Sequence, residues 1–432
     1  MDIRPLKKQK VSTDYKDSIN REVLNFDFEK LCNVTLSNSN VYCCLTCGKY
    51  FQGRSISSPA YNHTLNNDHH IFINLKNQKF YIIPENQEIE PIQDIIDYLD
   101  PKYTKEDILN LPEISTDLHN KQYKVGYVGL DNISNNDYEN VIIQALSHIP
   151  SIRDFYLKLS YREKLQNQIS KKSPLNDRFG ILIRKIWSKH LYRNHISPHE
   201  LLQYISSVTK GTFSLTVQNS PKKFLIWFLN QLNSQLVKYT KSTVISDSIQ
   251  GNIEITSYKT DAEPIITKSK FWVITLDLPP PPLFAGETIA EVDLSSLMKK
   301  YNGIEKSHIS KDELRSYKLV HPFPPFLIVH IDRGVEKDNI KKGNPTVVQF
   351  PDIMDFSPYT DSKESLNYRL LSIIKHESIT GNEIDESDIK SEWAISIRRN
   401  EEWITIKDSE LKPCQRELLF LDENYIQVWE RY

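Results

Sequence analysis

Four of the chain's five cysteines crowd into residues 32–47, and two histidines follow at a zinc-finger spacing. Two residues separate Cys44 from Cys47, fifteen lie between Cys47 and His63, and five lie between His63 and His69. Structural zinc takes four thiolate or imidazole ligands in a tetrahedron. A segment this short cannot bury a large core, so metal binding would contribute directly to its folding. We therefore expect one structural Zn²⁺ ion held by these four side chains.

Neighbouring residues offer alternative ligands. His70 could replace His69, and Cys43 could replace Cys44, because each adjoins the favoured residue. Cys32 has no partner at ligand spacing, and we expect it to pack in the interior. The clustering of thiols favours a reducing compartment and a metal over a disulfide framework, which would spread its cysteines along the chain.

The bulk composition excludes several classes of protein. The 432 residues carry a formal net charge of −2, and 39% of them are hydrophobic. This length suggests two or three globular units, and the near-neutral charge gives no sign of nucleic-acid or membrane binding. No apolar run approaches the ~20 residues that span a bilayer, and the N-terminus lacks the apolar centre of a signal peptide. We expect a soluble intracellular protein with no membrane contact.

The N-terminus carries a short basic run, PLKKQKV, at residues 5–11. Nuclear import receptors read Lys-rich runs of this kind, although most such runs are simply solvated. We expect residues 1–20 to form a disordered tail that includes this candidate nuclear signal.

The rest of the chain divides into three parts. Residues 21–90 alternate short apolar runs with Asn, Ser and Gly turns, as a small zinc-organised module would. Residues 91–120 show helical periodicity punctuated by prolines, and we expect a helical connector. From residue 121 to residue 432, helical patterns such as DYENVIIQALSHI come first, and β-branched, aromatic runs such as FWVITLDLP and NYIQVWE follow. Helices before strands, without alternation, predict an α+β domain with an antiparallel sheet.

The finger segment VYCCLTCGKYFQGR, with the later runs AYNH, DHHIFINL and KFYIIP, resembles the ubiquitin-binding UBP-type zinc finger. In binding members an arginine and aromatic side chains hold the C-terminal glycines of ubiquitin. The resemblance places Arg54 at the arginine position and leaves Phe80 or Tyr81 as the aromatic residue. It also implies that one further metal site of the family is lost, because its ligand positions are occupied here by Thr35, Gln52 and Pro59.

Residues from about 120 to 432 resemble the catalytic domain of the ubiquitin-specific proteases. That family opens with Gly-Leu-x-Asn-Leu-Gly-Asn-Thr-Cys-Tyr-x-Asn, and this chain reads GLDNISNNDYEN at 129–140. The resemblance places Asp137 at the catalytic cysteine and Asn135 at a position that steadies the oxyanion. A carboxylate there can accept backbone N–H bonds at a helix start. It is a poor nucleophile toward an amide, because the mixed anhydride that it would form is more activated than the isopeptide.

The later family motifs are altered as well. The Gly-His-Tyr position reads SEW at 391–393, so Glu392 replaces the catalytic histidine. The run WITIKD puts Lys407 at the catalytic acid, and His376 in YRLLSIIKHES matches a histidine that is not catalytic in relatives. Residues that act as a unit cannot all be lost while activity remains. We expect an inactive protease scaffold, in which Cys414 is an ordinary thiol.

The resemblance implies a papain-like fold of thumb, palm and fingers behind the small zinc finger. The fingers of relatives carry two CxxC pairs that this chain lacks, so we expect packing to hold them instead. Asp137 and Glu392 could in principle form a carboxylate pair for acid–base or metal chemistry. We expect Lys407 to form an ion pair with one of them.

The finger, the altered protease domain and the runs FDFEKLC, CGKYFQGR and YIQVWE together resemble the ubiquitin-protease-like splicing factors of the spliceosomal tri-snRNP. The resemblance implies a nuclear, non-catalytic factor that supports tri-snRNP assembly or stability during pre-mRNA splicing. We expect it to contact tri-snRNP proteins, with RNA contact secondary because no long basic stripe is visible. A reader of ubiquitin or a ubiquitin-like modifier, and an active isopeptidase, are the alternatives.

Overall fold

A computed structural model describes most of the chain, namely residues 13–27, 29–159, 162–259, 263–280, 290–310, 312–334, 343–360, 365–379 and 390–432. The candidate nuclear signal at residues 5–11 lies outside these ranges. Thr13–Ser18, which the sequence assigns to a disordered tail, forms a 3-10 helix. In the described part of the chain, no helix combines the length and the apolar character needed to cross a bilayer.

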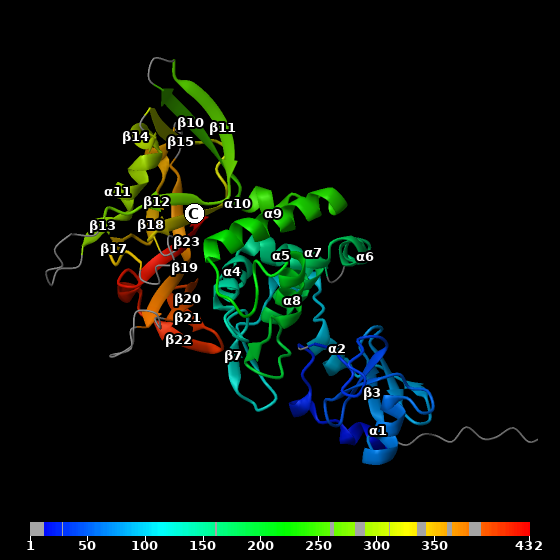
Figure 1. Cartoon of the computed structure of the whole chain (residues 1–432). Helices are drawn as coiled ribbons and strands as arrows, with labels where there is room; N and C mark the ends of the chain where they lie inside the picture. The colour runs from blue at the N-terminus through cyan, green and yellow to red at the C-terminus, as the bar shows by residue number, and fades with distance from the viewer. Residues whose placement is uncertain are drawn as a thin grey trace, which may run out of the picture.

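The N-terminal module is a five-stranded antiparallel sheet in the order β2-β1-β3-β4-β5, with one helix beside it (Figure 1). The helix starts at Pro59 behind a Ser58 cap, whose hydroxyl accepts a bond from Tyr61 N–H, and ends where Asp68 turns left-handed. These caps fix the helix that carries His63. The elements are β1 (Val41–Cys44), β2 (Tyr50–Gln52), α1 (Pro59–Asn67), β3 (Ile71–Asn74), β4 (Lys79–Ile82) and β5 (Gln87–Ile89).

The expected connector is two short helices and a hairpin. The second helix begins with a capping box between Thr104 and Asp107, which satisfies donors at its N-terminus. The elements are α2 (Gln93–Leu99), α3 (Lys105–Leu109), β6 (Ile114–Thr116) and β7 (Gln122–Lys124).

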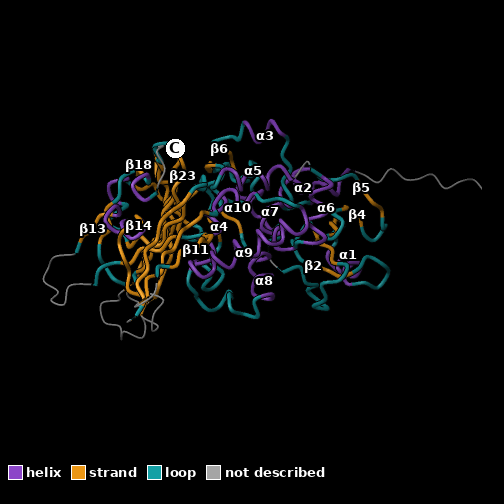
Figure 2. The backbone as a smooth tube through the Cα atoms, turned by 90° about the horizontal axis from the view of Figure 1, so that it is seen from above, coloured by secondary structure: helices purple, strands orange, loops and turns teal. Residues whose placement is uncertain are grey.

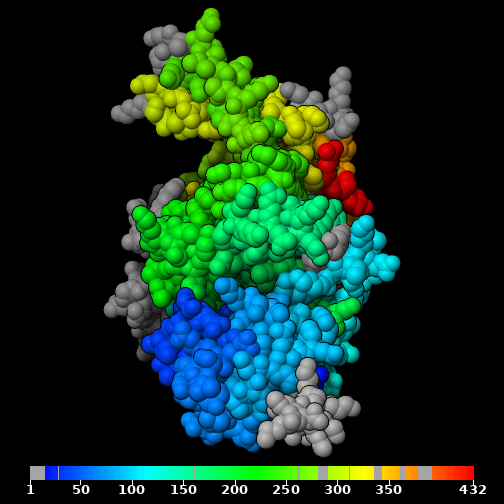
Figure 3. All heavy atoms as spheres, turned by 90° about the vertical axis from the view of Figure 1, so that its right-hand side faces the viewer, coloured from blue at the N-terminus to red at the C-terminus, as the bar shows by residue number. Residues whose placement is uncertain are grey.

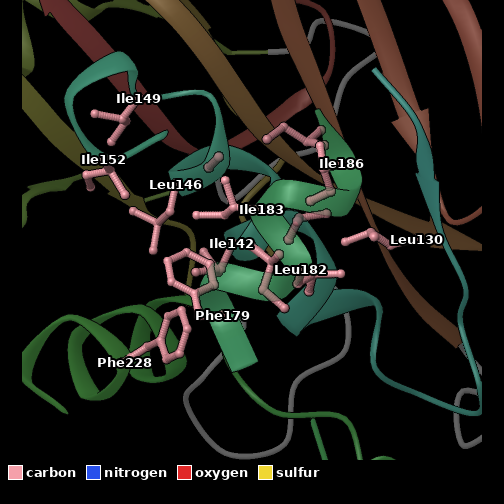
Figure 4. Packing of buried hydrophobic residues seen from close by; sticks show 14 of the residues in the cluster. Leu130, Ile142, Leu146, Ile149, Ile152, Phe179, Leu182, Ile183, Ile186 and Phe228 are labelled. Carbon is pink, nitrogen blue, oxygen red and sulfur yellow. The ribbon is translucent and has the colours of Figure 1, made fainter. Parts of the chain in front are cut away.

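The helical half of the second domain is built around α4 and α7. Every residue of α4 is buried, because other helices cover one side and the large sheet covers the other. Figure 4 shows Ile142 and Leu146 of α4 among Phe179 and Ile183 of α7 and Phe228 of α9. The helices are α4 (Asp137–Ser147), α5 (Pro150–Lys158), α6 (Glu163–Lys172), α7 (Pro174–Ile186), α8 (His199–Val208), α9 (Pro221–Thr240) and α10 (Val244–Ile249), and a two-stranded parallel ladder joins β8 (Gly129–Leu130) to β9 (His195–Ile196).

A large sheet forms the other half, so helices and strands occupy separate sides of the domain (Figure 2). The order is β12-β16-β23-β19-β20-β21-β22, with β18 pairing β19. The predicted α+β class is confirmed, with one difference: β12 pairs β16 in parallel. The strands are β12 (Ile274–Asp277), β16 (Phe326–Asp332), β18 (Ile353–Asp355), β19 (Asn367–Ile379), β20 (Lys390–Arg399), β21 (Glu402–Lys407), β22 (Glu410–Cys414) and β23 (Glu423–Arg431).

A four-stranded antiparallel sheet in the order β11-β10-β15-β14 extends from the domain (Figure 1). It contains no cysteine, and Ile253 and Leu319 at its base are buried in the core of the large sheet. Backbone ladders and this packed base hold it together. The elements of this region are β10 (Gly251–Lys259), β11 (Ile265–Phe271), β13 (Glu291–Asp293), α11 (Leu294–Met298), β14 (Asn302–Ser310), β15 (Glu313–Val320) and β17 (Val347–Gln349).

The N-terminal module is docked on the helical half by buried charged and aromatic contacts. Lys185 of α7 reaches Asp27 at 2.5 Å, and both side chains are nearly buried. Tyr98 of α2 stacks on Tyr192 with ring centres 4.1 Å apart. A buried ion pair depends on both partners, because either charge alone would be stranded in a poorly hydrated site.

Replacing Lys185 by methionine should lower the free energy of unfolding by about 3–5 kcal/mol, because Asp27 is left as an unpaired buried charge. The matched control is Lys189→Met, since the pair that Lys189 forms with Asp107 is largely exposed and should contribute less than about 1 kcal/mol. Urea unfolding followed by tryptophan fluorescence measures both variants. An equal decrease in the free energy of unfolding of the two variants would contradict the conclusion that the buried Lys185–Asp27 pair stabilises this interface.

Candidate functional site

The predicted zinc ligands come together in the N-terminal module. Ligand atoms of Cys44, Cys47, His63 and His69 all lie within 4.8 Å of one another. His63 Nε2 is 3.5 Å from Cys47 Sγ and 3.1 Å from His69 Nδ1. Tetrahedral zinc with bonds of about 2.0–2.3 Å sets its ligands roughly 3.3–3.8 Å apart. The donor set and its spacing therefore fit a structural Zn²⁺ ion with no position left open for water.

The alternative ligands are engaged elsewhere. His70 lies 2.8 Å from Asp68 through Nε2 and 2.9 Å from the Ile83 carbonyl through Nδ1, so both of its ring nitrogens have partners. The thiol of Cys43 donates to the carbonyl of Cys44, and burial raises the pKa of this thiol. Neither residue belongs to the four-ligand cluster.

Cys32 is buried, as the sequence predicts, and contacts Thr35 and Gln52. Its sulfur accepts backbone N–H groups of Val34, Thr35 and Gln52. The Thr35 hydroxyl donates to the Gln52 side chain at 2.9 Å. Burial raises the pKa of Cys32, but the Thr35 side chain and the backbone N–H donors outweigh it and the net shift is downward. Hydrogen bonds thus link Cys32, Thr35 and Gln52.

Arg54 lies on an aromatic face, as the resemblance to ubiquitin-binding fingers requires. Its guanidinium sits 4.1 Å from the centre of the Tyr81 ring and donates to the side chain of Asn86. Phe80, the other aromatic candidate, is fully buried in the module's core. Tyr81 is also buried, at 5% exposure, but unlike Phe80 it contacts Arg54, so the arginine–aromatic pair is Arg54 and Tyr81.

Asp137, the first residue of α4, is a buried carboxylate surrounded by donors. Its oxygens accept bonds from Gln218 Nε2 at 2.8 and 3.0 Å, from Trp393 N–H at 3.0 Å and from Tyr138 N–H at 3.0 Å. Burial raises the pKa of Asp137 in spite of these donors, and the nearby charge of Glu392 adds to the rise. Asp137 thus joins α4 to β20 and to the segment before α9.

Glu392 and Lys407 form the expected ion pair. Lys407 Nζ lies 2.5 Å from Glu392 and 2.6 Å from Glu377. Partial burial opposes the charged form of Lys407, but the two carboxylates raise its pKa. The ammonium is therefore held charged between two acids, and no imidazole stands at this position.

The remaining residues of the opening motif serve structural roles. The Asn135 side chain donates to the Thr216 carbonyl at 2.8 Å and is exposed, so its N–H group is occupied outside the Asp137 site. Gly129 lies close to the turn between β21 and β22, where a Cβ atom on residue 129 would sit 2.5 Å from the Cα of Ser409. Leu130 N–H donates to the carbonyl of Asp408 at 3.0 Å. The glycine is needed for this close approach.

Little space remains around Asp137. Side chains including Asp137, Gln144, Trp393 and Asp408 enclose a cavity of about 10 Å³, at the limit of one water molecule. His376 is buried against Trp393 and bonds Glu423 at 2.9 Å. The chain's five cysteines lie in the N-terminal module and in β22, so no thiol stands beside this imidazole. The arrangement holds the two domain halves together, and the described side chains around Asp137 leave space for about one water molecule.

A larger groove of about 1120 Å³ lies on the other side of Asp408. It runs between β7 and the β21–β22 hairpin, and its walls carry lysine and glutamate side chains together with Tyr123 and Leu411. Among the described residues β22 is the last strand of its sheet and pairs only with β21, so one wall of the groove is formed by an edge strand.

Sequence reasoning missed four residues of the Asp137 region: Gln218, Glu377, Asp408 and Glu139. Asp408 directly follows Lys407 and could have been found from the family motif. Gln218 and Glu377 lie in segments whose approach to the site only the fold sets. Glu139 is buried, and this burial raises its pKa to about 8.

Metal analysis of the purified chain should find one zinc ion per molecule. Cys47→Ser should lose the ion and lower the melting temperature of the N-terminal module, because a hydroxyl does not replace a thiolate ligand. Cys32→Ser is the control and should keep the ion, since Cys32 lies outside the four-ligand cluster. Zinc lost from Cys32→Ser, or fully retained by Cys47→Ser, would refute the assignment.

Known protein families match both the region of the four-ligand cluster and the region around Asp137. Residues 128–429 match the family described as "Ubiquitin carboxyl-terminal hydrolase". Residues 30–94 match the family described as "Zn-finger in ubiquitin-hydrolases and other protein". Each match covers the region in which the corresponding site lies.

Two relatives and one solved structure are similar over nearly the whole chain. "Probable mRNA-splicing protein ubp10" of Schizosaccharomyces pombe is 36% identical, covering 96% of this chain and 88% of the relative. "Ubiquitin carboxyl-terminal hydrolase 39" of Homo sapiens is 35% identical, covering 96% and 79%. The structure described as "Crystal structure of an essential yeast splicing factor" has a TM-score of 0.81 at 30% identity, covering 97% and 99%. The chain therefore belongs to the ubiquitin carboxyl-terminal hydrolase family, and its N-terminal module belongs to the zinc-finger family found in such hydrolases.

Proposed function

We propose that this chain is a non-catalytic, nuclear pre-mRNA splicing factor that supports assembly or stability of the tri-snRNP through protein–protein contacts. The observation that carries the proposal is the environment of Asp137. Three donor groups bind the carboxylate in a buried site, and Lys407 bridges Glu392 and Glu377 beside it. The names of two similar proteins, the ubp10 splicing protein and the yeast splicing factor, support the splicing role.

The chemistry of the three substituted positions supports an inactive centre. Amide cleavage in the family needs a thiolate, an imidazole that moves protons and an acid that orients it. Here the nucleophile position carries a carboxylate whose oxygens are already hydrogen-bonded. The imidazole position carries Glu392, which cannot act as base and acid while it is paired with Lys407. We propose that Asp137, Glu392 and Lys407 act as structural residues.

A scaffold that loses its chemistry keeps the surfaces that once held a folded protein, and those surfaces can serve docking. The large groove beside β22 supports this role, because an exposed strand edge can pair with an extended segment of a partner. We further propose that residues 21–90, 91–120 and 121–432 form the zinc finger, the helical connector and the inactive protease-like domain.

The Asp137→Asn variant tests the proposal directly. Asparagine keeps the size and one acceptor oxygen but turns an NH2 group toward a backbone donor, so the variant should melt at a lower temperature than the wild type. Below that temperature it should still sediment with the tri-snRNP and restore splicing to an extract depleted of the wild-type chain. A ubiquitin derivative with an electrophilic C-terminus should leave the wild-type chain unlabelled. Loss of splicing by the variant below its melting temperature, or covalent capture of the wild type, would overturn the proposal.

A second candidate function is recognition of ubiquitin, or of a related modifier, by the finger. Arg54 and Tyr81 support it, because a guanidinium above an aromatic face can bind a C-terminal carboxylate by charge-assisted hydrogen bonds. Titration of free ubiquitin should then give binding that Arg54→Ala weakens at least about tenfold. Lys79→Ala, which removes a neighbouring exposed cation, is the matched control. Equal binding by all three proteins, or no binding by the wild type, would exclude this candidate.

A further inference from the structure

Positive charge is concentrated in the helical half of the protein. Residues 137–249, from the start of α4 to the end of α10, contain 16 Lys and Arg residues against 7 Asp and Glu residues. The complete chain has a formal net charge of −2. The rest of the chain is therefore acidic, and the near-neutral total conceals this separation.

Part of this positive charge is used inside the protein. Arg184, Lys185 and Lys189 pair with acids of the connector and the N-terminal module. The buried pairs of Arg184 and Lys185 hold the N-terminal part of the chain on the helical half, and the exposed Lys189 is already paired with Asp107.

A second group of cations is exposed on α6 and at the C-terminal end of α9. We define the α6–α9 lysine patch as three lysines of α6 and two at the end of α9, all of them exposed: Lys164, Lys171, Lys172, Lys238 and Lys241. Within the described part of the chain, none of the five has an acidic group within 4.0 Å. The patch is therefore a region of uncompensated positive charge.

Tertiary packing brings the two segments of the patch together. Ser173 donates to the Gln235 side chain at 2.7 Å, and Gln168 donates to the Tyr239 carbonyl. These two bonds set α6 antiparallel to α9. Positions 164, 168 and 171 share one face of a helix, so the α6 lysines lie next to the C-terminus of α9. Figure 3 faces this side of the molecule, with teal-green α6 below green α9.

Acidic residues are few in the two helices that carry the patch. Helix α9 contains no acidic residue, and Glu163 is the only acid of α6. Asp177 of α7 accepts bonds from Gln166 and Ser170, which lie on a different face of α6 from positions 164, 168 and 171. Lys238 Nζ lies 5.1 Å from the centre of the Tyr239 ring, which places an aromatic face within the patch.

We propose that the α6–α9 lysine patch binds the phosphate backbone of single-stranded RNA. Clustered lysines neutralise phosphates and release counterions, which favours binding without sequence preference. A protein partner fits less well, because the cores of protein interfaces are depleted of lysine. A membrane surface fits less well too, because the apolar sides of α6 and α9 are packed against each other and α7 and cannot insert.

The test is fluorescence anisotropy of the full chain with a labelled oligouridine of about 20 nucleotides, measured over a range of salt concentrations. The quadruple variant Lys164→Gln, Lys171→Gln, Lys238→Gln, Lys241→Gln should weaken binding at least tenfold near 0.1 M salt. Its log–log salt slope should fall by about 3, since each lost phosphate contact contributes about 0.7. The matched control removes four exposed lysines from the extended sheet and its base: Lys259, Lys268, Lys270 and Lys299.

The control should bind RNA with the affinity and slope of the wild type. Equal losses in the two quadruple variants would overturn the proposal, because binding would then follow total charge rather than the patch. Competition by poly-glutamate as effective as that by unlabelled RNA would also overturn it, in favour of an acidic protein partner. Retained binding by the patch variant with an unchanged salt slope would show that RNA binds elsewhere.

Discussion

The buried carboxylate of Asp137 is the contact on which the arrangement of the large domain depends. It lies at the N-terminus of α4 and accepts bonds from Gln218 before α9 and from Trp393 in β20. Burying a carboxylate is unfavourable unless several donors replace its water. Here the donors come from both halves of the domain, so the helical half and the sheet must meet in one fixed geometry for the charge to be satisfied.

The partly buried charges next to Asp137 are also satisfied by partners within the protein. Lys407 is placed between Glu392 and Glu377, and the pair is only partly exposed. These bonds use the side chains that would otherwise be free for acid–base chemistry. Asp137, Glu392 and Lys407 thus belong to a network of hydrogen bonds and ion pairs that stabilises the domain. Its position beside an open groove of about 1120 Å³ agrees with a docking role.

Patterns that depend on local periodicity and spacing were predictable. The α4 pattern, the strands β12 and β23, and the ligand cluster of the finger appear where their apolar repeats or Cys-His spacing placed them. The parallel pairing of β12 with β16 was missed, because strand direction depends on a long connection that leaves no local signal.

The sequence by itself determined the chemistry of each position: four zinc ligands, no thiol at residue 137, and a lysine where the family has an acid. Those facts need no coordinates, because they concern which atoms are present. Only the tertiary structure decided which groups meet, namely Gln218 with Asp137, Glu377 with Lys407, and Gln168 of α6 with Tyr239 of α9. Charge and hydrogen bonding act over a few ångströms in space, and these residues, 30 to 81 positions apart, share that space only after the chain has packed.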